Sequence, residues 1–68
     1  MKFYSILRDR RFLLDITQQD LADISGVSLR AIKIIENGKG NPSIGTLKKL
    51  TDVLGIEIIM KVREVPEK

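Results

Sequence analysis

Arg30 and Lys33 stand three positions apart in the middle of the chain. In a helix this spacing places both side chains on one face, opposite the face that carries Ile32 and Ile35. A guanidinium can donate two parallel hydrogen bonds to O6 and N7 of guanine, and an ammonium group can reach a base edge or a phosphate. The pair predicts a surface that binds nucleic acid, although a charge pattern alone fits an ordinary solvated face equally well.

The composition argues against most catalytic and metal-binding chemistry. The 68 residues contain no His and no Cys, so the usual general base, the usual zinc ligands and any disulfide are missing. Nine carboxylates remain, scattered over polar faces as solvated charges usually are. No nucleophile, base and orienting group stand together, and we expect no enzyme, no metal site and no cofactor.

The net charge of +3 is unevenly distributed. Basic residues dominate 1–14 and 28–49, whereas the charges of 15–27 are all acidic. The basic excess thus surrounds Arg30, as a phosphate-binding surface requires. No apolar run approaches the roughly 20 residues of a membrane span, and 1–14 is too charged for a secretory signal. We expect a cytoplasmic protein of a bacterium or phage, with no membrane partner.

Two short helices joined by a turn at Gly26 are predicted to position the basic pair. Thr17 caps a helix over 18–25, with Asp20 in capping-box position, and Gly26 suits the left-handed residue that ends it. Ser28 caps a second helix over 29–37, which ends at Asn37-Gly38.

Flanking helices should complete a mainly α bundle of four to five helices over 1–55. The first is predicted from about residue 4 or 5 to Leu14, with Phe3, Leu7 and Leu14 near one stripe. Asp15 follows, and Asp tolerates a left-handed conformation better than most residues but worse than Gly. The last begins at the cap Ser43 and ends before Gly55. Its core residues are expected at helical spacing: Ile44, Leu47, Leu50 and Leu54.

The segment 56–65 alternates as a β-strand does, and 66–68 form a short tail. One face of the predicted strand is apolar: Ile56, Ile58, Met60 and Val62. A lone strand leaves its backbone and its apolar face unpaired. We therefore expect the same strand of a second copy to pair with it antiparallel, giving a homodimer.

Three segments in register resemble a known family. TQQDLA from Thr17, SGVS from Ser25 and IENGKGNPS from Ile35 resemble the helix-turn-helix of phage Cro and C1 repressors and of the wider XRE-type regulators. The resemblance covers roughly 6–55. It implies a lambda-repressor-like DNA-binding bundle, here with a C-terminal dimerising β-strand.

The resemblance also implies the residues that meet double-stranded DNA. Base-reading positions are Ser28, Leu29, Arg30, Lys33 and Ile34. Phosphate-binding positions are Thr17, Gln18, Gln19, Asn37, Lys39, Asn41 and Lys48. The helix N-terminus at Gln18 favours anions through its unpaired N–H groups. Ile34 fits either a thymine methyl group or the core, and its spacing does not separate these alternatives.

By the same resemblance, Arg11 is expected to pair with Glu36 in a partly buried, structural ion pair. The alternative is two independent surface charges, which contribute little to stability. A buried pair would be costly to break, because either partner would remain charged and uncompensated.

Taken together, the sequence predicts a dimeric repressor that binds a palindromic operator and regulates its own transcription. The added C-terminal strand resembles HipB-type antitoxins, which would imply a HipA-like toxin kinase as a further partner. The alternative is a protein–protein interaction module that uses the strand without specific DNA binding.

Overall fold

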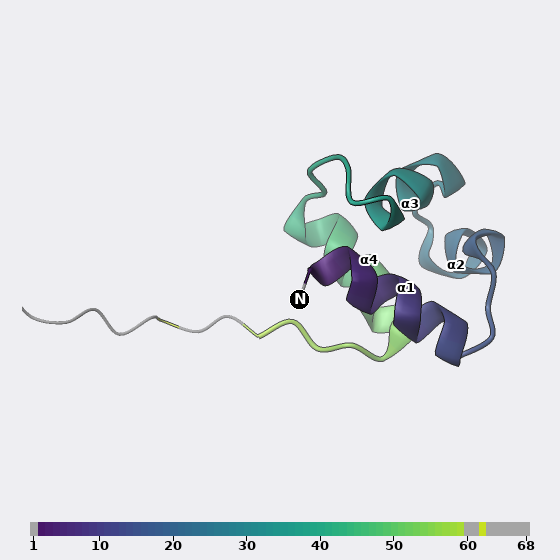
Figure 1. The fold of residues 1–68 in the computed structure, drawn as a ribbon, viewed down its shortest axis with the longest axis horizontal. Helices are drawn as coiled ribbons and strands as arrows, with labels where there is room; N and C mark the ends of the chain where they lie inside the picture. Colours follow the sequence, from purple (N-terminus) through teal and green to yellow (C-terminus); the bar gives the residue numbers. More distant parts are fainter. Residues whose placement is uncertain (1, 60–61, 63–68) are drawn as a thin grey trace, which may run out of the picture.

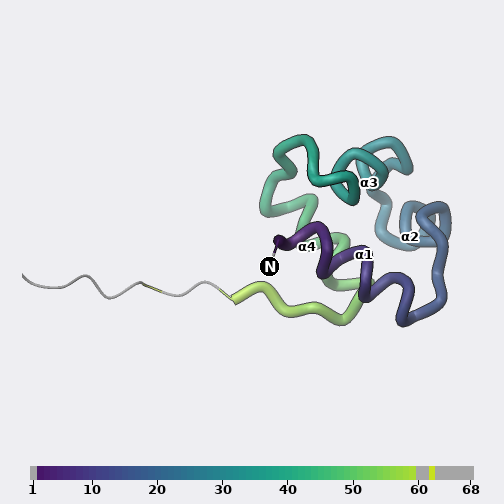
Figure 2. Tube along the Cα trace, viewed as in Figure 1, coloured from purple at the N-terminus to yellow at the C-terminus, as the bar shows by residue number. Residues whose placement is uncertain are grey.

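Four helices form the bundle. The computed structural model describes residues 2–59 and residue 62. The helices in this part of the chain are α1 (Phe3–Leu13), α2 (Gln18–Ser25), α3 (Leu29–Glu36) and α4 (Ile44–Leu54). Helix α2 packs on α3 and α4, and α1 also packs on both (Figures 1 and 2). The predicted mainly α helix-turn-helix bundle is confirmed, with four helices. None of these helices is long and apolar enough to cross a membrane.

Local signals set the helix ends. The Thr17 hydroxyl accepts from the Asp20 N–H at 3.0 Å, and the Thr17 N–H donates to the Asp20 carboxylate at 2.9 Å. Ser28 and Ser43 accept from backbone N–H groups in the same way and start α3 and α4. Gly26 ends α2 at φ 80°, and Asp15 is left-handed at φ 57°. The predicted boundaries are therefore right to within a residue or two.

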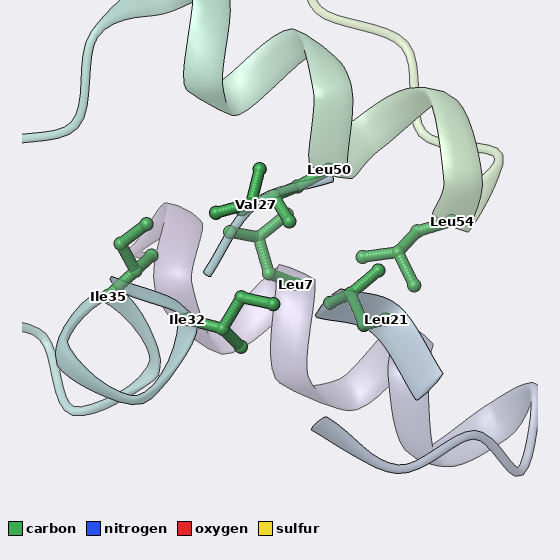
Figure 3. Packing of buried hydrophobic residues seen from close by; sticks show 7 residues of the cluster. All are labelled: Leu7, Leu21, Val27, Ile32, Ile35, Leu50 and Leu54. Atoms are coloured by element: carbon green, nitrogen blue, oxygen red, sulfur yellow. The ribbon is translucent and has the colours of Figure 1, made fainter. Parts of the chain in front are cut away.

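The core lies where the four helices meet. Figure 3 shows its seven buried apolar side chains, which come from all four helices and the turn before α3. They are Leu7, Leu21, Val27, Ile32, Ile35, Leu50 and Leu54. Ile16 and Leu47 pack against this cluster and are partly buried. The buried face of α3 is thereby held against α1 and α2, and its other face is left at the surface.

Two apolar predictions are wrong. Ile44 is 59% exposed, because the apolar period of α4 continues one turn beyond the part of the helix that packs on the core. Of the stripe predicted for the first helix, Phe3 and the C-cap residue Leu14 are exposed and only Leu7 is buried. The buried residues of α1 are instead Leu7 and, one turn later, Arg11. An apolar pattern could not reveal this face, because its second buried residue is charged.

The predicted strand over 56–65 is not found in its described part. Residues 56–59 and 62 have no regular secondary structure, since a strand needs a hydrogen-bonded neighbour and the described part of this single chain supplies none. Ile56 packs against the core, whereas Ile58 and Val62 are exposed. Met60 and the remaining predicted strand residues, with the tail 66–68, lie outside the described residues.

Candidate nucleic-acid interface

Helix α3 presents a basic outer face. Its inner residues Ile32 and Ile35 are buried, and Arg30 and Lys33 are exposed on the other side. Among the described residues, no carboxylate lies within salt-bridge distance of either basic side chain. Both charges are therefore available to a ligand that approaches α3.

The apolar neighbours of these two residues differ in exposure. Ile34 is 39% exposed, so the structure places it at the surface and not in the core. It lines an open recess with Gly40, Asn41 and Pro42, between α3 and the loop to α4. Leu29 is only partly exposed, and Ser28 is exposed with its hydroxyl engaged in capping. Of the five predicted base-reading positions, Leu29 is thus the least accessible.

The first turn of α2 carries three predicted phosphate-binding residues. By position, the N–H groups of Gln18 and Gln19 have no acceptor within the helix. The Gln19 amide donates to Asp23 at 2.9 Å and remains exposed. The Gln18 amide instead points inward and donates to Glu36 at 3.1 Å. A phosphate at this helix end would therefore meet the Gln18 backbone N–H more readily than its side chain.

A buried polar cluster joins three helices behind this surface; we call Arg11, Gln18 and Glu36 the clamp. The Arg11 guanidinium donates from Nε to Glu36 Oε2 and from Nη2 to Oε1, each at 2.8 Å. Its Nη1 donates to the Ile16 carbonyl at 3.0 Å. Arg11 is 7% exposed and Glu36 6%, so the structure forms the predicted ion pair in a buried setting.

The clamp shifts the ionisation of both charged partners. Burial alone would raise the pKa of Glu36, but the hydrogen bonds from Arg11 and Gln18, with the Arg11 charge, outweigh it and lower that pKa. The hydrogen bond to Glu36 raises the pKa of Arg11 despite burial. The pair is therefore ionised at neutral pH, and the end of α3 is fixed to α1 and to the start of α2.

The loop after α3 carries Asn37, Lys39 and Asn41, all exposed beside the basic face. Gly38 bends it at φ 77°, and a Cβ there would lie 2.7 Å from the Tyr4 ring. Lys48 lies elsewhere: it lines a recess with Glu57 and Ile58 and approaches Asp52 at 3.5 Å. The structure thus brings the loop residues to α3 but places Lys48 beside the C-terminal segment.

Two contacts that set this geometry could not be predicted from the spacing of residues in the sequence. Gln18 donates to Glu36, and Arg10 donates from Nε to the Leu54 carbonyl at 2.7 Å, closing the end of α4. Each joins residues far apart in the chain, so no local spacing indicates it. The only available hint was chemical, since a helix end leaves carbonyl groups that a basic side chain can satisfy.

Comparisons with known proteins agree with this geometry. Residues 7–59 match the family described as Helix-turn-helix. The chain is 38% identical over 58 residues to the cryptic phage CTXphi transcriptional repressor RstR of Vibrio cholerae, covering 85% of this chain and 52% of that repressor. It is 40% identical over 52 residues to an uncharacterised HTH-type transcriptional regulator of Methanocaldococcus jannaschii, covering 76% of this chain and 79% of that protein. The chain therefore spans about half of the length of the first relative.

Proposed function

The chain belongs to the XRE-type helix-turn-helix family of DNA-binding transcriptional regulators, and from this premise we propose that it is a dimeric repressor that binds a palindromic operator and represses its own transcription. The observation that carries the proposal is the orientation of α3. Its apolar face is buried, and Arg30 and Lys33 project from the opposite face, with no carboxylate of the described residues within salt-bridge distance.

In this proposal α3 enters the major groove. Arg30 reads guanine through its two-pronged guanidinium, and Lys33 reaches a base edge or a phosphate. Ile34 lies at the surface beside them, where an apolar side chain can contact a thymine methyl group. Ser28 and the partly exposed Leu29 lie at the start of the helix and contribute at the margin of the same surface.

The DNA backbone is held from both sides of α3. The start of α2 offers the unpaired N–H groups of Gln18 and Gln19 to one phosphate, with the Thr17 hydroxyl beside them. Asn37, Lys39 and Asn41 in the loop after α3 meet the backbone on the other side. Contacts of this kind fix the register of the protein on the duplex and carry no sequence information. Lys48 is the weakest candidate, given its place beside Glu57.

Repression requires two copies in this proposal. A two-fold dimer places its two α3 helices in successive major grooves, about 34 Å apart, which matches a palindromic site. The exposed apolar residues of the C-terminal segment, Ile58 and Val62, support pairing between copies through that segment. Bound dimers repress by covering the promoter.

The resemblance to HipB-type antitoxins adds a further proposed partner, a toxin kinase of the HipA type. It rests on the C-terminal segment, whose alternating apolar residues follow the helical bundle directly. The observation that tests it is the neighbouring gene. A HipA-like reading frame beside this one would support the antitoxin role, and copurification of the two products would establish it.

The test of DNA binding is fluorescence anisotropy with the duplex from upstream of the coding region and a scrambled duplex of equal composition. We expect salt-sensitive binding that favours the native duplex. Arg30→Ala should weaken binding to the native duplex by roughly 10- to 100-fold. Arg30→Lys is the matched control, because it keeps the positive charge but cannot donate two parallel hydrogen bonds to guanine. It should bind the scrambled duplex like the unmodified protein and discriminate less.

The same measurement distinguishes the proposed repressor from a protein–protein interaction module. A protein–protein interaction module would bind both duplexes weakly and equally, and neither Arg30 variant would change its behaviour. That result, obtained at low salt with folded protein, would overturn the DNA-binding proposal and favour the interaction module.

A further inference from the structure

A largely apolar recess lies between α3 and the loop that joins it to α4 in Figure 1. We call it the Ile34 recess. Six of its lining residues are Ala31, Ile34, Gly40, Asn41, Pro42 and Thr46. No charged side chain of the described residues lines it, although Arg30 lies one turn from Ile34 on the same helix. The recess therefore suits an apolar group of the DNA and not a phosphate.

Gly40 packs directly against the side chain of Ile34. It has a left-handed φ of 79°, and a Cβ at this position would lie 2.9 Å from Ile34 Cγ2. Carbon atoms in contact are about 3.5–4.0 Å apart. Any side chain at position 40 would therefore have to displace Ile34 or the loop. The missing Cβ is what allows the loop to lie this close to Ile34.

Neither the loop nor the Ile34 side chain can move away easily. The Lys39 N–H donates to the Ile34 carbonyl at 3.1 Å, immediately before Gly40. The Gly38 N–H donates to the Ile35 carbonyl at 2.9 Å, so the loop is tied to the end of α3 at two points. In a helix, a β-branched side chain such as that of Ile34 has one strongly preferred χ1 rotamer. The contact with Gly40 thus fixes where the Ile34 side chain lies.

We propose that Gly40 determines the base preference of the protein through Ile34, by keeping the Ile34 recess open for the C5 methyl group of a pyrimidine. The inference rests on the proposed DNA-binding repressor and deepens it by naming a specificity-determining residue outside α3. Gly40 is a positioning residue, because it has no side chain with which to touch a base. Thymine presents a methyl group in the major groove and cytosine does not. Burying that methyl group against Ile34 removes apolar surface of both from water.

The spacing along α3 places this methyl group relative to the guanine that Arg30 reads. Arg30 and Ile34 are four residues apart, so their side chains are neighbours on one face, about 6 Å apart along the helix axis. Stacked base pairs are about 3.4 Å apart. The methyl group should therefore belong to a thymine within two base pairs of that guanine.

Base analogues in the upstream duplex test the inference. Each thymine is replaced singly by deoxyuridine, which lacks only the methyl group, and binding is measured by fluorescence anisotropy. Binding of the unmodified protein should weaken about fourfold at one thymine of each half-site, the effect expected of one buried methyl group. A guanine within two base pairs should respond to 7-deazaguanine, which lacks the N7 acceptor, in the unmodified protein and not in Arg30→Ala.

The readout for the variants is the ratio of the affinities for the thymine and the deoxyuridine duplex. Partial unfolding of a variant lowers both affinities equally, so this ratio does not report stability. In Gly40→Ala the added Cβ should displace Ile34 and close the recess, and the ratio should fall from about four to about one. Ile34→Ala removes the atom that Gly40 contacts and should lower the ratio in the same way.

Gly38→Ala is the matched control, because it adds a Cβ at a positive φ in the same loop and meets Tyr4 instead of Ile34. It should keep the fourfold ratio. A full ratio in Gly40→Ala, its loss in Gly38→Ala, or an unmodified protein that responds to no thymine methyl group would overturn the inference. Each of these results leaves the preference for the native over the scrambled duplex intact, whereas failure of the proposed repressor abolishes that preference.

Discussion

The clamp and an apolar groove, which runs between the start of α1, the middle of α4 and the segment after Gly55, lie in the same small bundle, and they leave their surroundings in opposite states. In the clamp, Arg11, Gln18 and Glu36 satisfy one another, and no buried side-chain nitrogen or oxygen of the described residues lacks a hydrogen-bond partner. The groove is lined by Phe3, Ile6 and Ile58, which remain exposed. The helix-turn-helix half of the molecule, formed by α2, α3 and the end of α1, is thus complete within one chain. The other half, formed by the start of α1, α4 and the segment after Gly55, still has an apolar surface to bury.

This contrast has a physical origin. Charged groups can be buried in a small domain only where every donor and acceptor is matched, so the clamp must be completed within the chain that makes it. Apolar surface carries no such geometric demand, and a second chain can cover it later.

The largest effect is expected at Glu36. Glu36→Ala leaves the Arg11 guanidinium buried beside an empty space, and breaking such a pair costs about 3–5 kcal/mol. A domain of this size rarely has more stability than that, so the variant should be largely unfolded at 25 °C by circular dichroism. The loss should not depend on protein concentration, since the clamp belongs to a single chain.

A paired replacement checks the cause. Arg11→Met with Glu36→Leu removes both charges and keeps apolar volume, so the double variant should unfold at higher urea than Glu36→Ala. If Glu36→Ala lies within about 0.5 kcal/mol of the unmodified protein, as surface substitutions do, the clamp is not what stabilises the helix-turn-helix half.

A second prediction concerns the contact between the two halves at Gly38. Gly38→Ala meets a positive φ and places a Cβ 2.7 Å from the Tyr4 ring, whereas Gly26→Ala meets a positive φ with nothing within 4 Å. The φ strain costs about 1–2 kcal/mol in either case. Displacing the ring should add about 1 kcal/mol or more for Gly38→Ala.

Urea unfolding of both variants measures the difference, and a Tyr4→Ala background identifies its source. There the two alanine substitutions should cost the same. Equal costs in the unmodified background would mean that the start of α1 does not hold the loop after α3, and the link between the two halves would have to lie elsewhere.

The third prediction is a loss of stability in acid. The pKa of Asp20 is lowered by the hydrogen bonds from Thr17, and that of Glu36 is lowered by Arg11 and Gln18 against the effect of burial. A lowered pKa means that the unfolded chain binds more protons, so this stability is present above the ordinary carboxyl pKa and is lost as the pH falls towards the folded value. Melting temperatures should therefore drop below about pH 4.5.

Asp20→Asn separates the two carboxylates, because an amide oxygen can still accept from Thr17 and does not titrate. The variant should lose less stability in acid than the unmodified protein and still lose some, through Glu36. A melting temperature that no longer changes with pH in Asp20→Asn would show that the clamp does not titrate in this range.

The sequence predicts local contacts of this molecule well and contacts between distant residues poorly. Thr17, Ser28 and Ser43 act within one turn of themselves, so the caps and the helix bounds could be predicted from spacing alone. The amide of Gln18 and the guanidinium of Arg10 act on residues brought near only by folding. Helical periodicity also gave Ile44 the same weight as Leu50, because it does not show where a neighbouring helix ends.

The smallest effect is expected at Ile44. Ile44→Ser should change the free energy of unfolding by no more than about 0.5 kcal/mol, because the side chain is 59% exposed. Leu50→Ser is the matched control on the same helix; Leu50 is 1% exposed, and the loss should be several kcal/mol. Both are measured by urea unfolding at two protein concentrations. Ile44 lines the recess that holds Glu57 and Ile58, so a loss at Ile44 that appears only at the higher concentration would mean that a second copy covers it. A loss of the same size at both concentrations would instead mean that α4 buries Ile44 within one chain, and the exposed half of the molecule would then be smaller than the structure indicates.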